Sequence, residues 1–381
     1  MRTLYLHGSP DFYGAGRVLL DILQIPGNAQ KAIVVFPHEG PLCNPIKELG
    51  VPVLIVNMGV LRKKYFTPHG VIGRMALWMI AIIRLRKLIK KEKIDAVYVN
   101  SLSVIIGPWL KINTSIKLIW HLHEIVEEPF ALRFFLTAQL KKADQILAVS
   151  KAAQQHWQRL LPDQPVHLLY NGIDVAMPTS WNTNKKWEGK RQKESDIIIG
   201  MIGRIQERKG QSYLLRIAEH ILLHTETGKA LNFSILIAGD AYPGYEHLTE
   251  HLIDEIKLRG LENHVSYIGY QEDIPGLLTE VDLVIVPSTL PDSFPTVVLE
   301  AMKFSLPVVA TRQGGCLEMI EEGITGFFIP LNDVETSANI LAALLPQKLR
   351  LQEAGKRGRE RVAALFSQTA FRENWLRLVQ G

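Results

Sequence analysis

The chain has 381 residues, of which 47% are hydrophobic and 21% charged, with 28 Gly, 20 Pro and two Cys. This composition excludes a disordered chain, a collagen-like repeat and a small disulfide-stapled domain, and the length predicts two domains. Residues 1–190 hold 24 Lys and Arg against 13 Asp and Glu, whereas residues 191–381 hold 19 against 25, so the first half is expected to meet an anionic partner: a membrane surface, a phosphorylated substrate or a nucleic acid.

Short, uniformly apolar runs alternate with helix-like patterns in the first half. The runs span residues 32–36, 51–56, 96–99, 117–120 and 145–149. Apolar runs of this length without polar alternation are typical of strands buried on both faces of a parallel sheet. They predict a doubly wound α/β domain.

The segment Leu61–Lys93 is strongly basic. It holds ten Lys and Arg against one acid, Glu92, around the apolar run Met75–Ile83. Nine apolar residues are too few to cross a bilayer, which needs about 20. Because a strand-like run follows at once, we expect a crossover helix that packs on the sheet. We also expect the basic residues of Leu61–Lys93 to contact anionic lipid.

The same alternation restarts in the second half. Apolar runs cover residues 196–200, 233–238, 265–268, 283–286, 307–310 and 326–329. Between the two series, Pro178–Ser195 follows neither period and is interpreted as a linker. We therefore predict a first domain at 1–177, a linker at 178–195 and a second domain at 196–366, followed by a terminal helix.

Neither the first residues nor the cysteines indicate export. The stretch Met1–Gly8 has no apolar signal core or cleavage site. Cys43 and Cys316 are too far apart in the chain for a CxxC pair and too few for a disulfide framework. We expect a reducing, cytoplasmic location.

A glycine-rich loop, Gly203–Gly210, lies between the first strand and the first helix of the second domain. In open α/β sheets, ligands bind at the carboxyl ends of strands, and glycines there let backbone amides approach a phosphate. Arg204 and Lys209 would supply the countercharge, because arginine suits a bidentate grip and lysine a point charge. The alternative is a tight turn whose basic side chains are solvated.

Two carboxylates eight residues apart follow the strand at 283–286. Asp292 stands in the loop, and Glu300 lies about one turn into a helix that begins near Thr296. The amides and dipole at a helix start favour phosphate. Carboxylates would repel phosphate, so we expect them to accept hydrogen bonds from hydroxyls. Hydroxyls together with a diphosphate describe a nucleotide sugar.

Over nearly its whole length the chain resembles the retaining glycosyltransferases of the GT-B fold, specifically glycosyltransferase family 4. The resemblance implies two doubly wound Rossmann-like domains facing across a cleft, with the helix at 367–381 crossing back onto the first domain. It also implies that Arg204 and Lys209 hold the donor diphosphate. Asp292 and Glu300 match its paired acidic motif, in which the first carboxylate contacts the donor sugar and the second the ribose.

The chain departs from that motif at two positions. Asp292 stands where the family has Glu, which shortens the side chain by one methylene, and Pro295 stands where Gly is frequent, which removes one backbone N–H. By the same resemblance, Gly203, Phe294 and Thr296 complete the predicted donor-binding residues.

The strand-like stretch Met1–Gly8 is followed by Gly14 and Gly16, which open a helix. The pattern fails as a dinucleotide fingerprint because Leu19 occupies the third glycine position. It resembles the family's glycine-rich loop beneath the donor phosphates or the acceptor, so we include both glycines in the donor site. A plain tight turn is the alternative.

Two histidines two residues apart end the strand at 117–120. His121 and His123 are expected on one face, yet no third ligand stands at a metal-binding spacing, so we predict no metal site. The family commonly has a His at the position of His123 that hydrogen-bonds the donor sugar, and by this resemblance we assign His123 to catalysis with Asp292, Arg204 and Lys209. His121 and Glu124 receive no role.

These expectations combine into a retaining, metal-independent glycosyltransferase. The resemblance implies that the acceptor hydroxyl attacks on the face that the diphosphate leaves. We expect no cofactor beyond the nucleotide-sugar co-substrate, a glycan or lipid-linked acceptor and no nucleic acid. The alternatives are a nucleotide-sugar epimerase or phosphorylase on the same fold, an NAD-dependent oxidoreductase, and a non-enzymatic scaffold in a membrane assembly.

Overall fold

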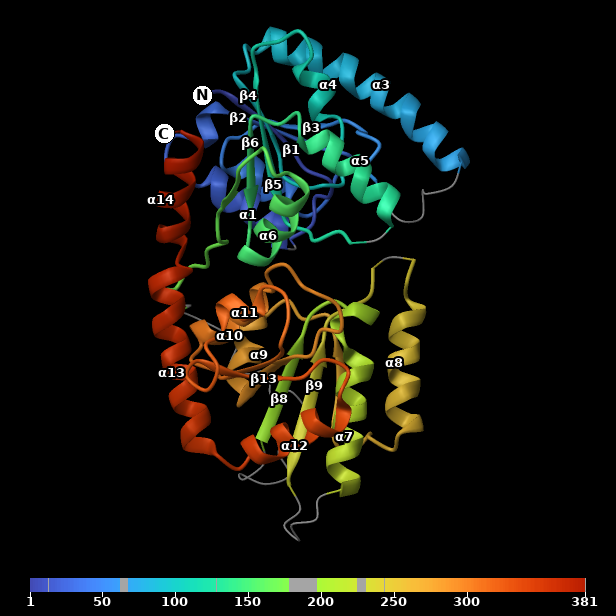
Figure 1. Ribbon diagram of the computed structural model, residues 1–381, viewed down its shortest axis with the longest axis vertical. Helices are drawn as coiled ribbons and strands as arrows, with labels where there is room; N and C mark the ends of the chain where they lie inside the picture. The colour runs from blue at the N-terminus through green and yellow to red at the C-terminus, as the bar shows by residue number, and fades with distance from the viewer. Residues whose placement is uncertain are drawn as a thin grey trace. The chain divides into compact units, whose positions relative to one another are not determined.

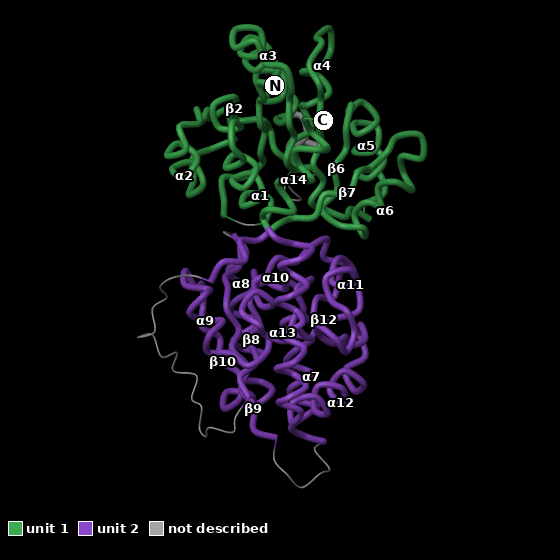
Figure 2. Tube along the Cα trace, turned by 90° about the vertical axis from the view of Figure 1, so that its left-hand side faces the viewer, with its two compact units in different colours: residues 1–172, 368–381 green, residues 173–367 purple. Residues whose placement is uncertain are grey.

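The computed structural model describes residues 1–12, 14–61, 68–127, 129–177, 197–224, 231–242 and 244–380. The chain divides into two compact units, residues 1–172 with 368–381 and residues 173–367 (Figure 2). The predicted linker at 178–195 lies outside the described residues, as do residues 62–67 of the basic segment.

The first unit is built on a parallel sheet in the order β3-β2-β1-β4-β5-β6-β7 (Figure 1). Its strands are β1 Thr3–Leu6, β2 Ala32–Phe36, β3 Val53–Ile55, β4 Ala96–Val99, β5 Lys117–Leu122, β6 Gln145–Ala148 and β7 Val166–Leu168. Its helices are α1 Gly14–Leu23, α2 Cys43–Glu48, α3 Pro68–Lys91, α4 Gly107–Lys111, α5 Phe130–Leu140, α6 Lys151–Leu160 and α14 Gln368–Val379. Successive side chains of β1 enter cores on opposite faces of the sheet, Leu4 and Leu6 on one face and Tyr5 on the other, as the predicted doubly wound unit requires.

The second unit repeats this design with a parallel sheet in the order β10-β9-β8-β11-β12-β13. Its strands are β8 Ile197–Ile202, β9 Phe233–Ala238, β10 Val265–Gly269, β11 Leu283–Val286, β12 Val308–Thr311 and β13 Gly326–Ile329. Its helices are α7 Gln211–His224, α8 His247–Leu258, α9 Ile274–Glu280, α10 Thr296–Lys303, α11 Cys316–Met319, α12 Val334–Leu344 and α13 Lys348–Leu365. Every residue of the neighbouring strands β11 and β12 is buried, as expected for strands covered on both faces.

Helix α3 is the predicted crossover between β3 and β4. It buries Ala81, Leu85 and Ile89, four residues apart, in the core of the first unit. Among the helices in the described ranges, none combines the length and the apolar character that a bilayer span requires.

Helix α14 belongs to the first unit although it follows the whole second unit in sequence. Phe371, Trp375 and Val379 are buried in the core that also holds α1, and Gln145 donates to the Leu378 carbonyl over 2.5 Å. The predicted return of the last helix to the first domain is therefore confirmed.

Candidate functional site

Both sheets reverse their order of strand addition at one central pair, β1 and β4 in the first unit and β8 and β11 in the second. Ligands of open α/β sheets bind outside the carboxyl ends of the strands at such a switch point. The predicted site residues all follow β1, β5, β8 or β11. The fold therefore gathers them at the carboxyl ends of the two sheets.

An ion pair joins the two predicted loops of the second unit. Lys209 Nζ lies 2.5 Å from Asp292 Oδ2, and these side chains are 24% and 14% exposed. Arg208 Nη2 lies 3.7 Å from the other carboxylate oxygen. Burial alone would raise the pKa of Asp292, but Lys209 and Arg208 outweigh it and hold that pKa below its ordinary value. Asp292 is therefore an ionised carboxylate next to two cations.

Backbone packing fixes these loops against each other. Gly210 has φ +81°, and a Cβ atom there would strike the carbonyl oxygen of Pro287 at the end of β11. Only glycine tolerates both conditions. Thr289 N donates to the Arg208 carbonyl over 2.9 Å, and Gly315 N donates to the Asp292 carbonyl over 2.8 Å. Backbone hydrogen bonds and close packing thus join the cationic loop and the acidic loop at the switch point.

The other cation of the loop, Arg204, is held by stacking. Its guanidinium carbon lies 3.1 Å from the ring centroid of Tyr242, and its carbonyl accepts from Gln211 Nε2 over 3.0 Å. Gly203 directly precedes it and has φ +157°, outside the range that other residues favour. Neither Tyr242 nor Arg208 was predicted, because each acts through a loop contact that sequence spacing does not show.

Helix α10 begins beside this cluster, as predicted. Thr296 is its first residue, and both Thr296 and Glu300 are partly exposed. Phe294 differs from its neighbours: it is 6% exposed, and its ring packs against Phe366 with centroids 5.8 Å apart. The Phe294 side chain therefore anchors the loop in the core of the second unit.

In the first unit, His123 follows β5 and contacts the end of β4. Its Nε2 atom lies 3.0 Å from Oδ1 of Asn100, which is fully buried. The rings of His121 and His123 lie 4.3 Å apart, as their shared face predicted. Burial, with smaller contributions from His121 and His7, holds the pKa of His123 well below its ordinary value, so the imidazole is neutral.

The neighbours of His123 in the chain, His121 and Glu124, make contacts inside the first unit. His121 is fully buried, its Nδ1 lies 3.0 Å from the Tyr98 hydroxyl, and burial lowers its pKa to about 3. The Glu124 carboxylate accepts from Ser101 Oγ over 3.1 Å and from the backbone N of His123 over 3.2 Å. Burial raises the pKa of Glu124, although these hydrogen bonds act to lower it. Glu124 thus ties the ends of β4 and β5 together.

The glycine-rich turn lies at the start of α1. A Cβ atom at Gly16 would strike the carbonyl oxygen of Asp11, whereas Gly14 has open space around its Cα. Gly16 therefore permits a close chain approach, and no such packing reason applies to Gly14. The Ala15 carbonyl between them accepts from Asn100 Nδ2 over 2.8 Å, which connects this turn to the His123 side chain.

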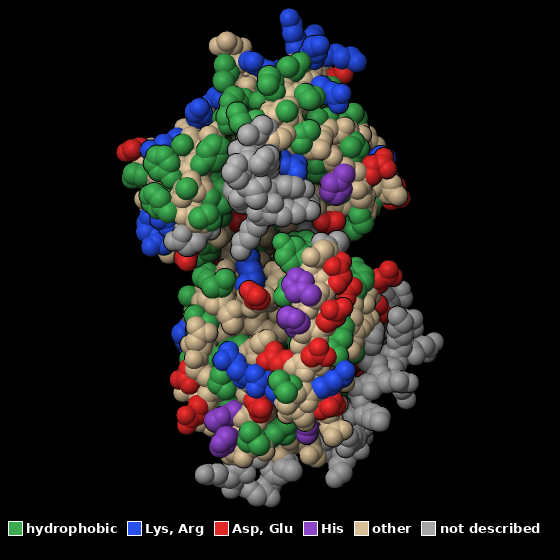
Figure 3. Space-filling model, turned by 90° about the vertical axis from the view of Figure 1, so that its right-hand side faces the viewer, with side chains coloured by type: hydrophobic (Ala, Val, Ile, Leu, Met, Phe, Trp, Pro, Cys, Tyr) green, Lys and Arg blue, Asp and Glu red, His purple; other side chains and the backbone are tan. Residues whose placement is uncertain are grey.

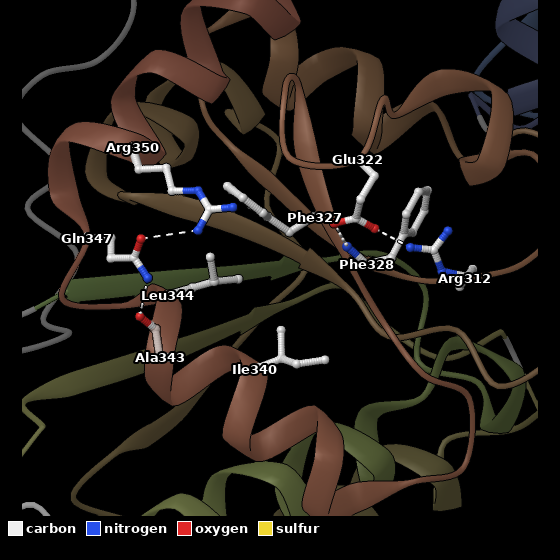
Figure 4. A pocket seen from close by; sticks show the side chains of 9 residues that line it. All are labelled: Arg312, Glu322, Phe327, Phe328, Ile340, Ala343, Leu344, Gln347 and Arg350. Carbon is white, nitrogen blue, oxygen red and sulfur yellow. Dashed lines mark hydrogen bonds and ion pairs between the residues drawn. The ribbon is translucent and has the colours of Figure 1, made fainter.

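A separate cavity of about 390 Å³ lies beside the edge strand β13 of the second unit (Figure 4). Its two arginines are held in place: Arg312 stacks on Phe328 and pairs with Glu322, and Arg350 stacks on Phe327. The cavity shares no residue with the cluster around Asp292. Within the described ranges, no three His, Cys, Asp or Glu side chains group as a metal site would require.

Two family models match the chain. The model described as glycosyl transferases group 1 matches residues 183–361, and the one described as glycosyltransferase family 4 matches residues 33–177. Together they cover both units.

Curated relatives of the chain are glycosyltransferases and a synthase. It is 22% identical over 373 residues to the Escherichia coli UDP-Gal:α-D-GlcNAc-diphosphoundecaprenol α-1,3-galactosyltransferase, covering 89% of this chain and 87% of that protein. It is 25% identical over 260 residues to the N-acetyl-α-D-glucosaminyl L-malate synthase of Bacillus anthracis, covering 67% and 65%. An uncharacterised glycosyltransferase of Methanocaldococcus jannaschii is 27% identical over 196 residues, and the chain spans only 46% of its length.

Solved structures share the fold over the full chain. HepE of Anabaena, crystallised with UDP and glucose, superposes with a TM-score of 0.84 at 22% identity, covering 100% of this chain and 99% of that one. Sucrose-phosphate synthase of Thermosynechococcus elongatus superposes with a TM-score of 0.79 at 18% identity, covering 100% and 98%. The predicted GT-B architecture of two Rossmann-like domains is confirmed.

Proposed function

Because the chain belongs to the group 1 glycosyltransferases of the GT-B fold, we propose that it transfers a sugar from a nucleotide diphosphate to a hydroxyl group of a glycan or lipid-linked acceptor. One observation carries the proposal: the cations Arg208 and Lys209 pair with the carboxylate Asp292 at the switch point of the second sheet, and Arg204 stands in the same loop as the two cations. HepE, which shares the fold, was crystallised with UDP. Residues 196–366 would then hold the donor, and residues 1–177 with 367–381 the acceptor.

The donor-binding roles follow from charge and position. Lys209 and Arg204 bind the diphosphate, aided by the amides at the start of α10 near Thr296. A phosphate oxygen competes with Asp292 for Lys209 Nζ, and the ionised carboxylate then accepts a hydrogen bond from a hydroxyl of the donor sugar. Glu300, one turn further along α10, accepts from the ribose hydroxyls.

The reaction we propose needs no metal and retains the anomeric configuration. The bond between the sugar C1 and the diphosphate oxygen breaks, while the acceptor oxygen bonds to C1 on the same face. The acceptor proton passes to the leaving phosphate. Negative charge grows on the diphosphate as the sugar becomes oxocarbenium-like, and Arg204 and Lys209 stabilise that charge in preorganised positions. His123 accepts a hydrogen bond from a hydroxyl of the reacting sugar.

We propose that the outer face of α3, which points away from the core of the first unit, contacts a membrane that carries the acceptor. The residues of this outer face are all exposed: Met75, Met79, Ile80, Ile83, Arg84, Lys87, Lys90 and Lys91. Hydrophobic and basic side chains also lie side by side on the face of the first unit seen in Figure 3. Apolar side chains beside lysines suit an anionic bilayer surface. The printed name of the E. coli relative includes a diphosphoundecaprenol acceptor.

Nucleotide binding and product analysis test the proposal. We expect UDP, GDP or dTDP to raise the melting temperature of the protein. We also expect the protein to consume one of the matching nucleotide sugars and to release its nucleoside diphosphate. Mass analysis distinguishes transfer from an epimerase, whose product has the mass of its substrate, and from a phosphorylase, which consumes phosphate. If no nucleoside diphosphate stabilises the protein, the proposed function is wrong.

A further inference from the structure

A buried asparagine, Asn100, connects the glycine-rich turn of the first unit with His123. It follows β4 directly, next to the switch point, and its side chain is 0% exposed. Nδ2 lies 2.8 Å from the Ala15 carbonyl oxygen, and Oδ1 lies 3.0 Å from His123 Nε2. Its own carbonyl oxygen lies 3.2 Å from His7 Nδ1. Asn100 Nδ2 also lies 3.3 Å from His7 Nδ1. Residues that follow β1, β4 and β5 therefore meet at Asn100.

These contacts determine which way the amide points. The Ala15 carbonyl can only accept a hydrogen bond, so the atom of Asn100 that faces it must be the NH₂ group. The oxygen then faces His123, and since an amide oxygen can only accept, His123 Nε2 must carry a proton. In a neutral imidazole only one nitrogen is protonated, which makes Nδ1 of His123 the acceptor.

The surroundings keep the imidazole neutral. Among the described residues, His7 and His121 act on the pKa of His123, and the Glu124 carboxylate accepts from the backbone N of His123. His7 and His121 are themselves buried, and burial lowers their pKa values to about 4 and about 3. Its described neighbours Asn100, His7 and His121 are therefore uncharged at neutral pH.

We propose that Asn100 is a positioning residue that fixes His123 in the Nε2–H tautomer, so that Nδ1 offers a lone pair to a substrate hydroxyl. This inference rests on the proposed function for its substrate, and it narrows the substrate class. A lone pair accepts from a hydroxyl, but it repels the carboxylate of an anionic sugar. The site therefore favours a neutral sugar at this contact.

The tautomer can be measured on the protein alone. In a long-range ¹H–¹⁵N spectrum of histidine-labelled protein, we expect His123 to show a protonated-type Nε2 and a non-protonated Nδ1, with the peaks assigned by their loss in His123→Gln. The wild-type result decides the tautomer whether or not a variant folds: a protonated Nδ1 at neutral pH overturns the inference. Tyr98→Phe removes the partner of His121 and serves as the matched control, which should leave the His123 tautomer unchanged.

Two variants test the role of Asn100 itself. Asn100→Ala should populate both tautomers and lower kcat/KM about ten- to hundredfold, because a buried donor loses its acceptor. Asn100→Asp sets a carboxylate against the imidazole, so the acidic limb of the kcat/KM profile should move to higher pH. An equal loss of activity at every pH, or an unchanged His123 spectrum in Asn100→Ala, would mean a merely structural role. If wild-type protein transfers no sugar, the proposed function fails, while the spectrum still decides the tautomer.

Discussion

Replacing Lys209 with methionine separates ligand binding from fold stability. The side chains of Lys209 and Asp292 are 24% and 14% exposed, so their ion pair is partly buried. A surface ion pair contributes about 0–1 kcal/mol, and breaking a buried one costs about 3–5 kcal/mol, so we expect an intermediate cost here. Arg208 stays 3.7 Å from the carboxylate and offsets part of the loss. We therefore expect the free energy of unfolding to fall by about 1–2 kcal/mol, which leaves the protein folded.

Nucleotide affinity should change more than stability does. A hydrogen bond from a charged donor to phosphate contributes about 1.5–3 kcal/mol, so the Kd for UDP, or for whichever nucleoside diphosphate binds, should rise about ten- to hundredfold. Isothermal titration measures the Kd, and urea unfolding measures stability. Arg350→Met, which removes a cation from the separate cavity of the same unit, should leave the Kd unchanged. A folded Lys209→Met protein with wild-type affinity would refute the assignment of the diphosphate to this loop.

Three further predictions concern backbone packing, pH and lipid. Gly210→Ala should lower the free energy of unfolding in urea by about 2–4 kcal/mol, because an alanine there would have a positive φ and its Cβ would collide with Pro287. Gly260→Ala, at φ +64° with open space around the Cβ position, should cost less. Equal losses of stability would contradict the collision. His7 and His121 are neutral when folded but charge below pH about 6.5 when unfolded. Stability should therefore fall as the pH drops from about 6.5 toward their folded pKa values of about 4 and about 3, by at most about 1.4 kcal/mol per histidine per pH unit. His121→Phe should reduce that slope, and a stability that does not change with pH would contradict it. Replacing the lysines of the outer face of α3 with glutamine should reduce sedimentation with anionic vesicles, whereas the same change in Lys348, Lys356 and Arg359 of α13 should not; equal sedimentation of both variants would remove α3 from the lipid interface.

The strands were predictable from the sequence because burial on both faces of a parallel sheet requires uninterrupted apolar runs, which the chain shows at β2, β4 and β6. β7 was not predicted, since Val166–Leu168 is too short to show a pattern. β5 runs two residues further than its apolar run predicted, to Leu122, because His121 and Leu122 still pair with β6. The buried His121 ring lies 3.0 Å from the Tyr98 hydroxyl.

The site was predictable where one loop holds the whole signal and not where distant segments meet. Arg204 and Lys209 stand in one glycine-rich turn, so their chemistry appears in a few consecutive residues. The contact between Asn100 and His123 depends on two strands being neighbours in the sheet, which no residue spacing reveals. The burial of Phe294 depends in the same way on Phe366, which lies 72 positions later in the chain.

The return of α14 has a consequence for synthesis on the ribosome. The core of the first unit includes Trp375, and the side chain of Gln380 donates to Asn28 Oδ1 over 2.9 Å. The amino-terminal half therefore leaves the exit tunnel with an unfilled hydrophobic face, while residues 173–367 can fold as a unit before it. A premature stop after Ser367 would expose that face and invite aggregation, even though every strand of both sheets had been translated.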